Sequence, residues 1–431
     1  MFAVALTGAN IIPVAQCPDE AGRRLLSDWI YDTGTLPTGN EYETYIELWG
    51  FSYALRPFLS AMIGAFFMRL TSIFTSSAQM LLATSRMSSV LSITACCFFC
   101  LKLGHRIFKE RRYAVMLAVF VCFLPQVMFL GMYQNNDILG LASVSAMLYF
   151  LAEGADTCWS IRSCIGLSVS FSVGLLSYYS VYVWLLMGGV FCVISVLHDK
   201  RIGTKPEFLI KHIALVCGIC ILLAGWFFIR NALLHNGDLL GIASEAASRR
   251  ALEEQGYTLQ PYVSLKRDGY SIPDFFMYHD GEFIKWTLQS LIGVFGYMDI
   301  RLPGQLYRLY YAVFLLCVIL YLLRILRHKP DFSERLMMFT VAAAAFLSFI
   351  LHFWTSYTRD YQPQGRYIIS SALLLGIMLS WGLEYAEKQL NNKAAETVFQ
   401  RILYRPSVIM SVLWSCMFVI SAALGMTQML L

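Results

Sequence analysis

Two adjacent carboxylates, Asp19 and Glu20, stand just past the first apolar run of this 431-residue chain. A carboxylate at a boundary between water and lipid is partly desolvated, which raises its pKa toward the range of a working general base. Either acid could therefore take a proton from an acceptor hydroxyl or amine. A structural interpretation is also open, because Asp19 with Arg23 and Glu20 with Arg24 have the i,i+4 spacing of ion pairs on a short helix along a membrane surface.

A third acid, Asp137, follows two asparagines and opens an apolar segment. Aspartate is a favoured N-cap, so Asp137 could serve only to start a helix. It could also face the first two acids across a site and bind an acceptor or a metal ion. The two roles are compatible, and the sequence does not decide between them.

Two arginines lie beside polar residues at the ends of apolar runs. Arg230 precedes Asn231 at the end of one run, and Arg366 follows Gln364 by two positions at the start of another. A guanidinium group presents a fork of donors that matches a phosphate, although an arginine at a membrane boundary also reaches for water without any ligand. Positive charge at a helix N-terminus opposes the helix dipole, so Arg366 needs compensation such as a bound anion.

Two further residues join these candidates for binding substrate or phosphate. Arg86 lies several residues inside an apolar run, where it needs an internal partner or an anion. Tyr367 directly follows Arg366 and belongs to the same polar motif. The sequence therefore predicts a site in which carboxylates act on an acceptor and arginines hold a phosphate.

The composition places these residues in a polytopic membrane protein. Charged residues make up only 14% of the chain and hydrophobic residues 58%, with a mean hydropathy of +0.58, whereas a soluble domain carries about 25% charged residues. The net charge of +5 is concentrated in connecting loops, so it bears on membrane orientation and gives no sign of a nucleic-acid partner. Most of the twelve cysteines lie within apolar runs and lack zinc-like spacing, so we infer neither disulfides nor a metal cluster.

The apolar runs predict an all-α fold with about eleven transmembrane helices, forming a single integral membrane domain over residues 1–431. The predicted spans are 1–15, 79–101, 113–131, 138–152, 164–178, 181–197, 212–229, 306–326, 335–354, 366–384 and 407–429. Two polar stretches are expected to form outer loops with interfacial helices. These are residues 16–53 and 231–299.

Four basic clusters should face the cytoplasm under the positive-inside rule. They are residues 102–112, 198–205, 324–329 and 385–405. All four clusters fall on the cytoplasmic side only if residues 54–74 do not span the membrane and form an interfacial or re-entrant helix. Such a helix suits Arg56 and Arg69. The acids, Arg230 and Arg366 then all fall on the extracytoplasmic face of the plasma membrane, and this convergence favours a functional site there.

Two kinds of transport protein fit the sequence poorly. We find no repeat of clear period and no matching pair of broken helices, which an inverted-repeat transporter is expected to show. Charges deep within the apolar runs are scarce, which weighs against an ion-coupled pump.

Taken together, the motifs resemble those of the GT-C superfamily, the membrane glycosyltransferases that use polyprenyl-phosphate sugars. The closest resemblance is to a bacterial branch of multi-span proteins with a P-D-E motif in the first outer loop. The matching pieces occur in family order over most of the chain. They are Pro18-Asp19-Glu20, Asn136-Asp137, Gly225-Trp226 with Arg230-Asn231 and Gly237-Asp238, Phe295-Gly296-Tyr297-Met298 with Leu302-Pro303, and Gln364-Gly365-Arg366-Tyr367.

The resemblance implies a lipid-linked sugar as donor and a glycan, lipid or protein of the cell envelope as acceptor, with inversion at the anomeric carbon. It implies Asp19 as the catalytic base, with Glu20 as a substitute and Asp137 as a secondary acid. Arg230 and Arg366 would hold the lipid phosphate. A divalent metal ion is left open.

Two other function classes stay open at this point. The protein could translocate or ligate lipid-linked glycans, in which case flipping should survive the loss of every outer acid. It could also be a non-catalytic scaffold in envelope assembly, in which case the arginines should tolerate replacement.

Overall fold

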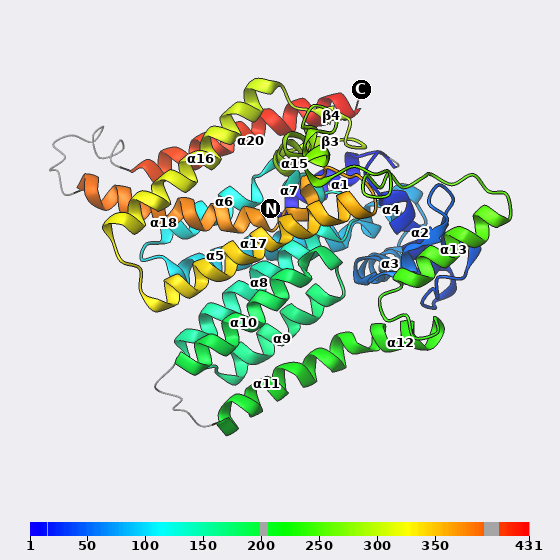
Figure 1. Ribbon diagram of the computed structural model, residues 1–431, viewed down its shortest axis with the longest axis horizontal. Helices are drawn as coiled ribbons and strands as arrows, with labels where there is room; N and C mark the ends of the chain where they lie inside the picture. The colour runs from blue at the N-terminus through cyan, green and yellow to red at the C-terminus, as the bar shows by residue number, and fades with distance from the viewer. Residues whose placement is uncertain (15, 199–205, 392–404, 431) are drawn as a thin grey trace.

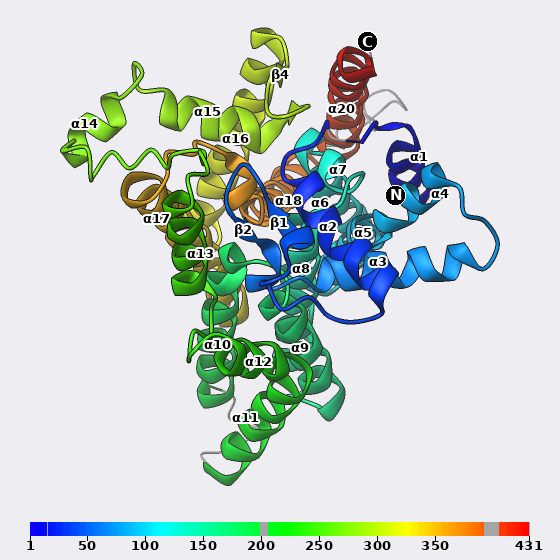
Figure 2. The same cartoon turned by 90° about the vertical axis from the view of Figure 1, so that its right-hand side faces the viewer.

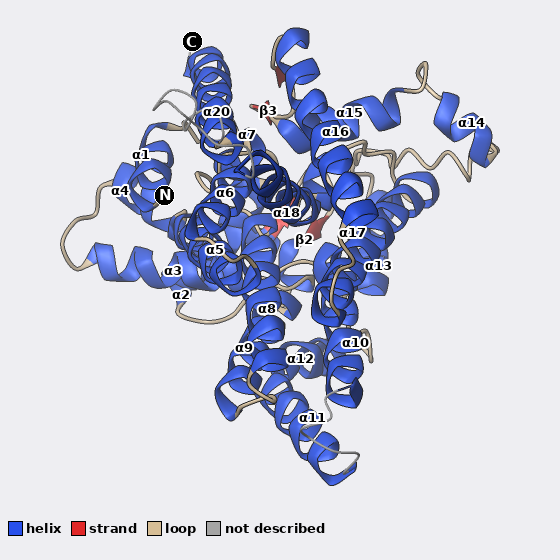
Figure 3. Ribbon diagram, turned by 90° about the vertical axis from the view of Figure 1, so that its left-hand side faces the viewer, coloured by secondary structure: helices blue, strands red, loops and turns tan. Residues whose placement is uncertain are grey.

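The computed structural model describes residues 1–14, 16–198, 206–391 and 405–430. Its long helices run roughly side by side, and Figure 1 shows α2 (Glu20–Thr33), α3 (Leu59–Ser72) and α13 (Ile242–Glu254) together near one end of them. Figure 2 looks onto this end, which we call the outer end. Figure 3, coloured by secondary structure, shows that helices dominate the molecule, which confirms the predicted all-α class.

The first quarter of the chain builds much of the outer end. Its elements are α1 (Phe2–Ile11), α2, the 3₁₀ turn η1 (Tyr42–Thr44), the antiparallel strands β1 (Tyr45–Ile46) and β2 (Phe51–Ser52), η2 (Tyr53–Leu55), α3, α4 (Ala78–Ser85) and α5 (Met87–Ile107). Helix α2 ends at Gly34, whose left-handed φ of 74° lets its N–H bond back to the carbonyl of Ile30.

The middle of the chain forms one half of the bundle. Its helices are α6 (Arg111–Cys122), α7 (Pro125–Leu130), α8 (Asp137–Asp156), α9 (Ile161–Leu175), the 3₁₀ turn η3 (Tyr179–Val181), α10 (Tyr182–His198), α11 (Pro206–Cys220), the π-helical η4 (Ile221–Gly225) and α12 (Trp226–Leu234). Pro125 begins α7 and cannot supply the N–H that would continue α6, so the 113–131 run breaks into two helices.

The rest of the chain starts with a long outer segment and returns to the bundle. Its elements are α13, α14 (Ile272–Met277), α15 (Glu282–Ile292), the antiparallel hairpin β3 (Val294–Phe295) and β4 (Ile300–Arg301), α16 (Gly304–Arg327), α17 (Phe332–Thr358), the 3₁₀ turn η5 (Gly365–Ile368), α18 (Ser371–Asn391) and α20 (Pro406–Leu430). The long segment is tied to the first loop by an ion pair between Arg56 and Glu245, 2.6 Å apart.

Seven helices in the described ranges are long and apolar enough to cross a membrane. They are Ala78–Ile107, Asp137–Asp156, Tyr179–His198, Ile210–Leu234, Gly304–Arg327, Phe332–Thr358 and Pro406–Leu430. The predicted count of about eleven also includes α1, α6 with α7, α9 and α18, and it stays a prediction. The basic clusters at 198–205 and 385–405 fall largely outside the described residues.

Helix α3 has the length expected of a segment that does not span. Its 14 residues cover roughly 21 Å, short of the roughly 30 Å of a hydrocarbon core. One side of α3 packs against the protein through small residues such as Ala61 and Gly64, while Phe66 on the other side is 63% exposed. The predicted spans α1 and α9 are also short, with 10 and 15 residues, so the interfacial or re-entrant helix at 54–74 stays a prediction.

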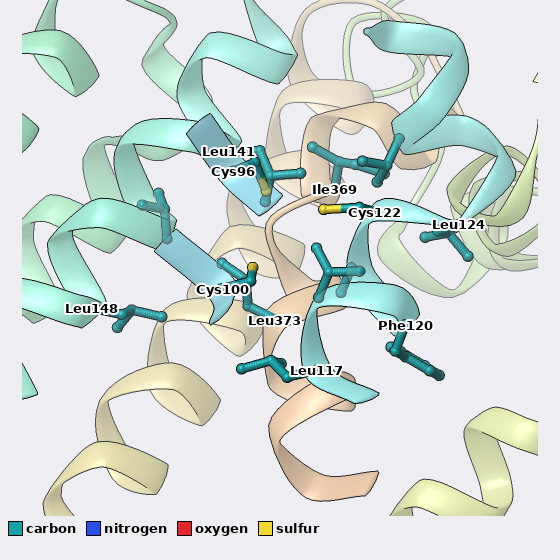
Figure 4. Packing of buried hydrophobic residues seen from close by; sticks show 14 of the residues in the cluster. Cys96, Cys100, Leu117, Phe120, Cys122, Leu124, Leu141, Leu148, Ile369 and Leu373 are labelled. Atoms are coloured by element: carbon teal, nitrogen blue, oxygen red, sulfur yellow. The ribbon is translucent and has the colours of Figure 1, made fainter. Parts of the chain in front are cut away.

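The largest hydrophobic core lies where α5, α6, α8 and α18 meet (Figure 4). Cys96 and Cys100 on α5 and Cys122 on α6 are fully buried there among leucines and Phe120. These cysteines therefore pack as small hydrophobic residues, as their apolar surroundings in the sequence suggested.

One glycine in this framework is needed to bring a polar motif to the outer end. A Cβ atom on Gly365 would overlap the backbone of Thr287 and Leu291 in α15, and the Gly365 N–H donates to the Ser290 hydroxyl at 2.6 Å. The close approach of η5 to α15 thus fixes the position of Arg366, the next residue.

We expect Gly365→Ala to lower the free energy of unfolding by about 1–3 kcal/mol, because the added methyl group must push two helices apart. Thermal unfolding in detergent measures the effect. Gly189→Ala in α10 is the matched control, since a Cβ there meets nothing within 4 Å, and it should unfold at or above the wild-type temperature. Equal unfolding temperatures for Gly365→Ala and wild type would contradict this account of the contact.

Candidate functional site

A left-handed turn sends the two adjacent acids in different directions. Asp19 has φ 61° and ψ −3° and caps α2, whose first residue is Glu20. Left-handed backbone is uncommon in residues other than glycine, although aspartate tolerates it better than most. The chain therefore turns sharply at Asp19, and the two carboxylates meet different partners.

Glu20 is buried in an ion pair with Arg86. The Arg86 Nε and Nη2 atoms donate to the two Glu20 oxygens at 2.7 and 2.8 Å, and both side chains are at most 1% exposed. Arg86 Nη1 donates to the carbonyls of Ala9 and Ile12. The internal partner that Arg86 was predicted to need is thus Glu20. The donor nitrogens of Arg86 are occupied by Glu20 and by backbone carbonyls, so both side chains are engaged within the protein.

One of the two i,i+4 ion pairs expected on α2 is present. Asp19 and Arg23 do pair, at 3.7 Å between Oδ2 and Nη2. The predicted pair of Glu20 with Arg24 is wrong, because the Arg24 Nε atom instead contacts the Asp28 carboxylate at 3.2 Å. Burial of Glu20 beside Arg86 removes it from the surface on which Arg24 lies.

Asp19 meets Arg366, which the sequence separates from it by most of the chain. The Arg366 Nη2 atom lies 2.7 Å from Asp19 Oδ2, and the side chains are 4% and 23% exposed, respectively. This carboxylate supplies the compensation that Arg366 was predicted to need.

The ion pair keeps Asp19 ionised. Burial by itself would raise the pKa of Asp19, but the charges of Arg366 and Arg23 and hydrogen bonds from Arg366 and Tyr53 lower it to about 2. Since this value lies below the ordinary pKa of about 3.9, the carboxylate contributes stability above about pH 4 and loses that contribution only as the pH falls through 2. While it is paired, Asp19 is a weak base.

Asp137 lies near Asp19, Arg23 and Arg366, and these four residues form the buried charged group of the site. Asp137 has no hydrogen-bond partner in it. It is 2% exposed, and neither of its carboxylate oxygens accepts a hydrogen bond in the described structure. The N-cap interpretation is wrong, because Asn136 is the capping residue and the Asn135 side chain accepts the N–H of Ile138 at 3.0 Å. A buried carboxylate without donors is costly, so Asp137 is suited to accept hydrogen bonds from a ligand.

Arg366 is oriented by its own motif. Its Nε atom donates to the Gln364 side chain at 2.7 Å, and its Nη2 atom also contacts the Tyr367 hydroxyl at 3.3 Å. The Tyr367 hydroxyl in turn donates to the Gln362 side chain. The Arg366 Nη1 atom is buried without a partner. Gln364 and Tyr367 thus hold the Arg366 guanidinium group in place and leave its Nη1 atom free.

Arg23 is a second arginine of this group, and the sequence analysis did not assign it to the site. It is 5% exposed and lies between the rings of Tyr53 and Tyr178, 5.3 and 5.6 Å from their centroids. Its Nε and Nη1 atoms are buried without partners. The only sequence signal for Arg23 was its i,i+4 spacing from Asp19.

A small cavity of about 10 Å³, which is room for about one water molecule, lies beside Arg23 and has a charged part and an apolar part. Arg23 and Arg56 contribute the charge, and the apolar wall is made by Leu26, Phe58 and Ala61. A phosphate attached to a hydrocarbon chain needs both kinds of surface, because the phosphate seeks guanidinium donors and the hydrocarbon avoids water.

The unpartnered buried atoms around this group form a set that the protein alone leaves unsatisfied. They are Asp137 Oδ1 and Oδ2, Arg23 Nε and Nη1, Arg366 Nη1 and the Tyr133 hydroxyl. Asp19, Asp137 and Arg366 all act on Tyr133 electrostatically, so these groups are near neighbours. Buried polar atoms are nearly always hydrogen-bonded in folded proteins, so this group is a candidate binding site.

Arg230 and Asn231 lie elsewhere. The Arg230 Nη2 atom donates to the carbonyls of Leu36 and Pro37 at 3.2 and 2.6 Å, and Asn231 donates to the carbonyl of Leu55 at 3.0 Å. These contacts hold the first outer loop against α12. Arg230 Nη1 is buried without a partner, and the phosphate-binding role predicted for Arg230 stays a prediction.

No group of three or more His, Cys, Asp or Glu side chains that could hold a metal ion occurs among the residues that the structure describes. Asp19 and Asp137 are two carboxylates near each other, the number with which Mg²⁺ is bound where substrate phosphates complete its coordination.

The fold defined by this bundle and outer end is GT-C-like. The chain is similar to ArnT from Cupriavidus metallidurans bound to undecaprenyl phosphate, with 13% identity and a TM-score of 0.56 over 99% of this chain and 71% of that one. It is also similar to the oligosaccharyltransferase AglB from Archaeoglobus fulgidus in complex with an inhibitory peptide and a dolichol-phosphate, with 12% identity and a TM-score of 0.53. That match covers 99% of this chain and 55% of AglB, so the chain spans little more than half of the AglB length.

The chain belongs to the family described as "Predicted membrane protein (DUF2142)", whose model matches residues 49–375, and it is a multi-pass membrane protein. No curated protein matches the sequence. The family match begins after Pro18-Asp19-Glu20, so assignment to a branch with this motif stays a prediction.

We expect Glu20→Ala to destabilise the protein by about 3–5 kcal/mol, because it leaves the Arg86 charge buried and unpaired. Asp28→Ala, which breaks the partly exposed pair with Arg24, is the control and should cost at most about 1 kcal/mol. Both are measured by chemical unfolding of the detergent-solubilised chain. Similar losses for the two variants would show that the buried pair is not a special link between α1, α2 and α5.

Proposed function

We propose that this protein is a membrane glycosyltransferase. It transfers a sugar from a polyprenyl-phosphate donor to a cell-envelope acceptor on the extracytoplasmic face of the cytoplasmic membrane, with inversion at the anomeric carbon. The observation that carries the proposal is the buried group of Asp19, Asp137, Arg23 and Arg366 with its unpartnered atoms. The lipid phosphates bound to ArnT and AglB support a donor of this kind.

In this proposal the donor phosphate lies between Arg23 and Arg366. Their three unpartnered nitrogen atoms can donate to phosphate oxygens, and charge-assisted bonds of this type are strong. The cavity beside Arg23 has room for about one water molecule, so in this proposal Leu26, Phe58 and Ala61 move apart before the first isoprene units can lie against them. The lipid therefore enters from the side of α2 and α3.

Binding of the phosphate also prepares Asp19 to act as the base. The phosphate competes for Arg366, and once the 2.7 Å contact to Asp19 is lost, the lowering of the Asp19 pKa is relieved. The freed carboxylate, in its partly buried position, is then a better acceptor for a proton. Donor binding thus comes before acceptor deprotonation.

The transfer step itself is a single displacement. Asp19 accepts the proton of the acceptor O–H or N–H group, and the acceptor atom forms a bond to the anomeric carbon. The bond from that carbon to the phosphate oxygen breaks, and its electron pair leaves with the polyprenyl phosphate. Arg23 and Arg366 stabilise the negative charge that grows on the leaving oxygen, while Asp137 accepts hydrogen bonds from sugar hydroxyls and keeps the ring in place.

We expect Arg366→Lys and Arg23→Lys each to weaken the binding of undecaprenyl phosphate by roughly ten-fold or more, since a lysine loses the forked donor geometry. Arg24→Lys, on the same helix but paired with Asp28, is the control and should bind as wild type. Thermophoresis of the solubilised chain gives the dissociation constants, and unfolding temperatures show whether each variant is folded. Wild-type affinity in both site variants would place the phosphate elsewhere.

We expect Asp19→Asn to reduce sugar transfer at least about a hundred-fold, because the amide cannot accept the acceptor's proton. Its affinity for undecaprenyl phosphate should be equal or higher, since Arg366 is no longer neutralised by a carboxylate. Transfer is measured with undecaprenyl-phosphate sugars and a membrane acceptor fraction, and Asp28→Asn is the control. Full transfer by Asp19→Asn would refute the assignment of the base.

A further inference from the structure

Four side chains form a row that joins the two arginines of the site. The Arg366 guanidinium group lies over the Tyr367 ring, 5.1 Å from its centroid. The Tyr367 ring stacks on the Tyr178 ring, with 6.3 Å between the centroids and 19° between the planes. The Arg23 guanidinium group lies over the other ring of this pair, 5.6 Å from the Tyr178 centroid. Tyr178 thus connects Arg23 to the motif that carries Arg366, and the proposed mechanism gives it no role.

The arginines at the two ends of this row meet at one oxygen atom. The Asp19 Oδ2 atom lies 2.7 Å from Arg366 Nη2 and 3.7 Å from Arg23 Nη2. A phosphate oxygen that takes the place of this carboxylate oxygen can accept from both guanidinium groups. Such a shared contact depends on the spacing of the two groups, because a hydrogen bond weakens steeply outside its normal distance and angle.

The backbone around Tyr178 is held by its neighbours. The Tyr178 carbonyl accepts the N–H of Val181 at 3.2 Å. A Cβ atom on Gly140 would come within 2.8 Å of the Val181 side chain, so this segment packs directly on α8. On the other side of Tyr178, the carbonyl of Leu176 accepts the N–H of Leu59 in α3 at 3.4 Å. The position of Tyr178, whose side chain also lines the small cavity of the site, is therefore set by α3 and α8.

We infer that Tyr178 is a positioning residue for the donor phosphate. Its ring lies between Arg23 and Tyr367 and keeps the two guanidinium groups directed at the same phosphate oxygen. An aromatic face suits this role, because it attracts a guanidinium group and stacks on its plane, which leaves the N–H edges free for the phosphate. This inference rests on the proposed function and deepens it by naming a residue that controls phosphate affinity without touching the phosphate.

The test measures the binding of undecaprenyl phosphate to the full-length chain in lipid nanodiscs. Tyr178→Leu should bind roughly ten-fold more weakly, because it removes a cation–π contact and an aromatic pair. Tyr178→Phe keeps the ring and should restore binding to within about two-fold of wild type. Tyr311→Leu is the matched control, because Tyr311 stacks on Tyr307 at 6.4 Å and 19° in α16, a helix that carries neither arginine. This control should bind as wild type.

Combined changes distinguish positioning from a purely structural role. Arg23→Lys should weaken binding roughly ten-fold or more in the wild-type background, but by about two-fold or less in the Tyr178→Leu background, because the shared contact is already lost there. A Tyr178→Leu chain that is only less stable would show the full effect of Arg23→Lys. Unfolding temperatures of all variants are measured alongside the dissociation constants.

The inference would be overturned by wild-type affinity in Tyr178→Leu, by an equal loss in Tyr178→Phe or Tyr311→Leu, or by independent effects of Arg23→Lys and Tyr178→Leu. If Tyr178→Leu does not fold, Tyr178→Met takes its place, and failure of both to fold would overturn the inference by showing that the ring serves the fold itself. Failure of the proposed function has a different signature, namely wild-type binding of undecaprenyl phosphate, or none in the wild type, when Arg23→Lys and Arg366→Lys are compared with it.

Discussion

The structure depends on the neutralisation of charges that are buried at the outer end of the bundle. A charge removed from water costs several kcal/mol unless it is paired and hydrogen-bonded. Glu20 with Arg86 links α1, α2 and α5, and Asp19 with Arg366 links the first loop to η5. These two pairs bring segments from both ends of the chain together and leave Asp137 as the carboxylate without a partner.

The backbone turn at Asp19 gives the two adjacent acids different surroundings, one inside the bundle and one at the edge of the site. The left-handed conformation of Asp19 lets Glu20 point into the bundle, where Arg86 satisfies both of its oxygens. Asp19 stays at the edge of the group, partly exposed and paired with an arginine that a phosphate can take over. In the proposed function, an anion that binds there competes with a carboxylate, and this competition would couple donor binding to the protonation of Asp19.

Much of the fold followed from patterns along the chain. Long apolar runs and basic loops predict the helices and place the polar motifs at one end, and the isolated Arg86 correctly indicated an internal partner. The order of the apolar runs placed Asp19 and Arg366 on the same face, but it could not predict their direct contact, because it gives the face and not the distance between two side chains. Arg230 was assigned by its place at a helix end, a pattern that cannot distinguish a ligand donor from a residue that binds loop carbonyls. Arg23 lies beside Asp19, and its spacing from Asp19 in the sequence had indicated that contact.

The most direct test of the account is an experimental structure of the full chain in lipid nanodiscs with undecaprenyl phosphate. The account predicts phosphate density between Arg23 and Arg366, with the Asp19 carboxylate moved away from the Arg366 guanidinium and the lipid chain against Leu26 and Phe58. The account would be contradicted by phosphate density beside Arg230, or by a bound lipid with the Asp19–Arg366 contact kept at 2.7 Å.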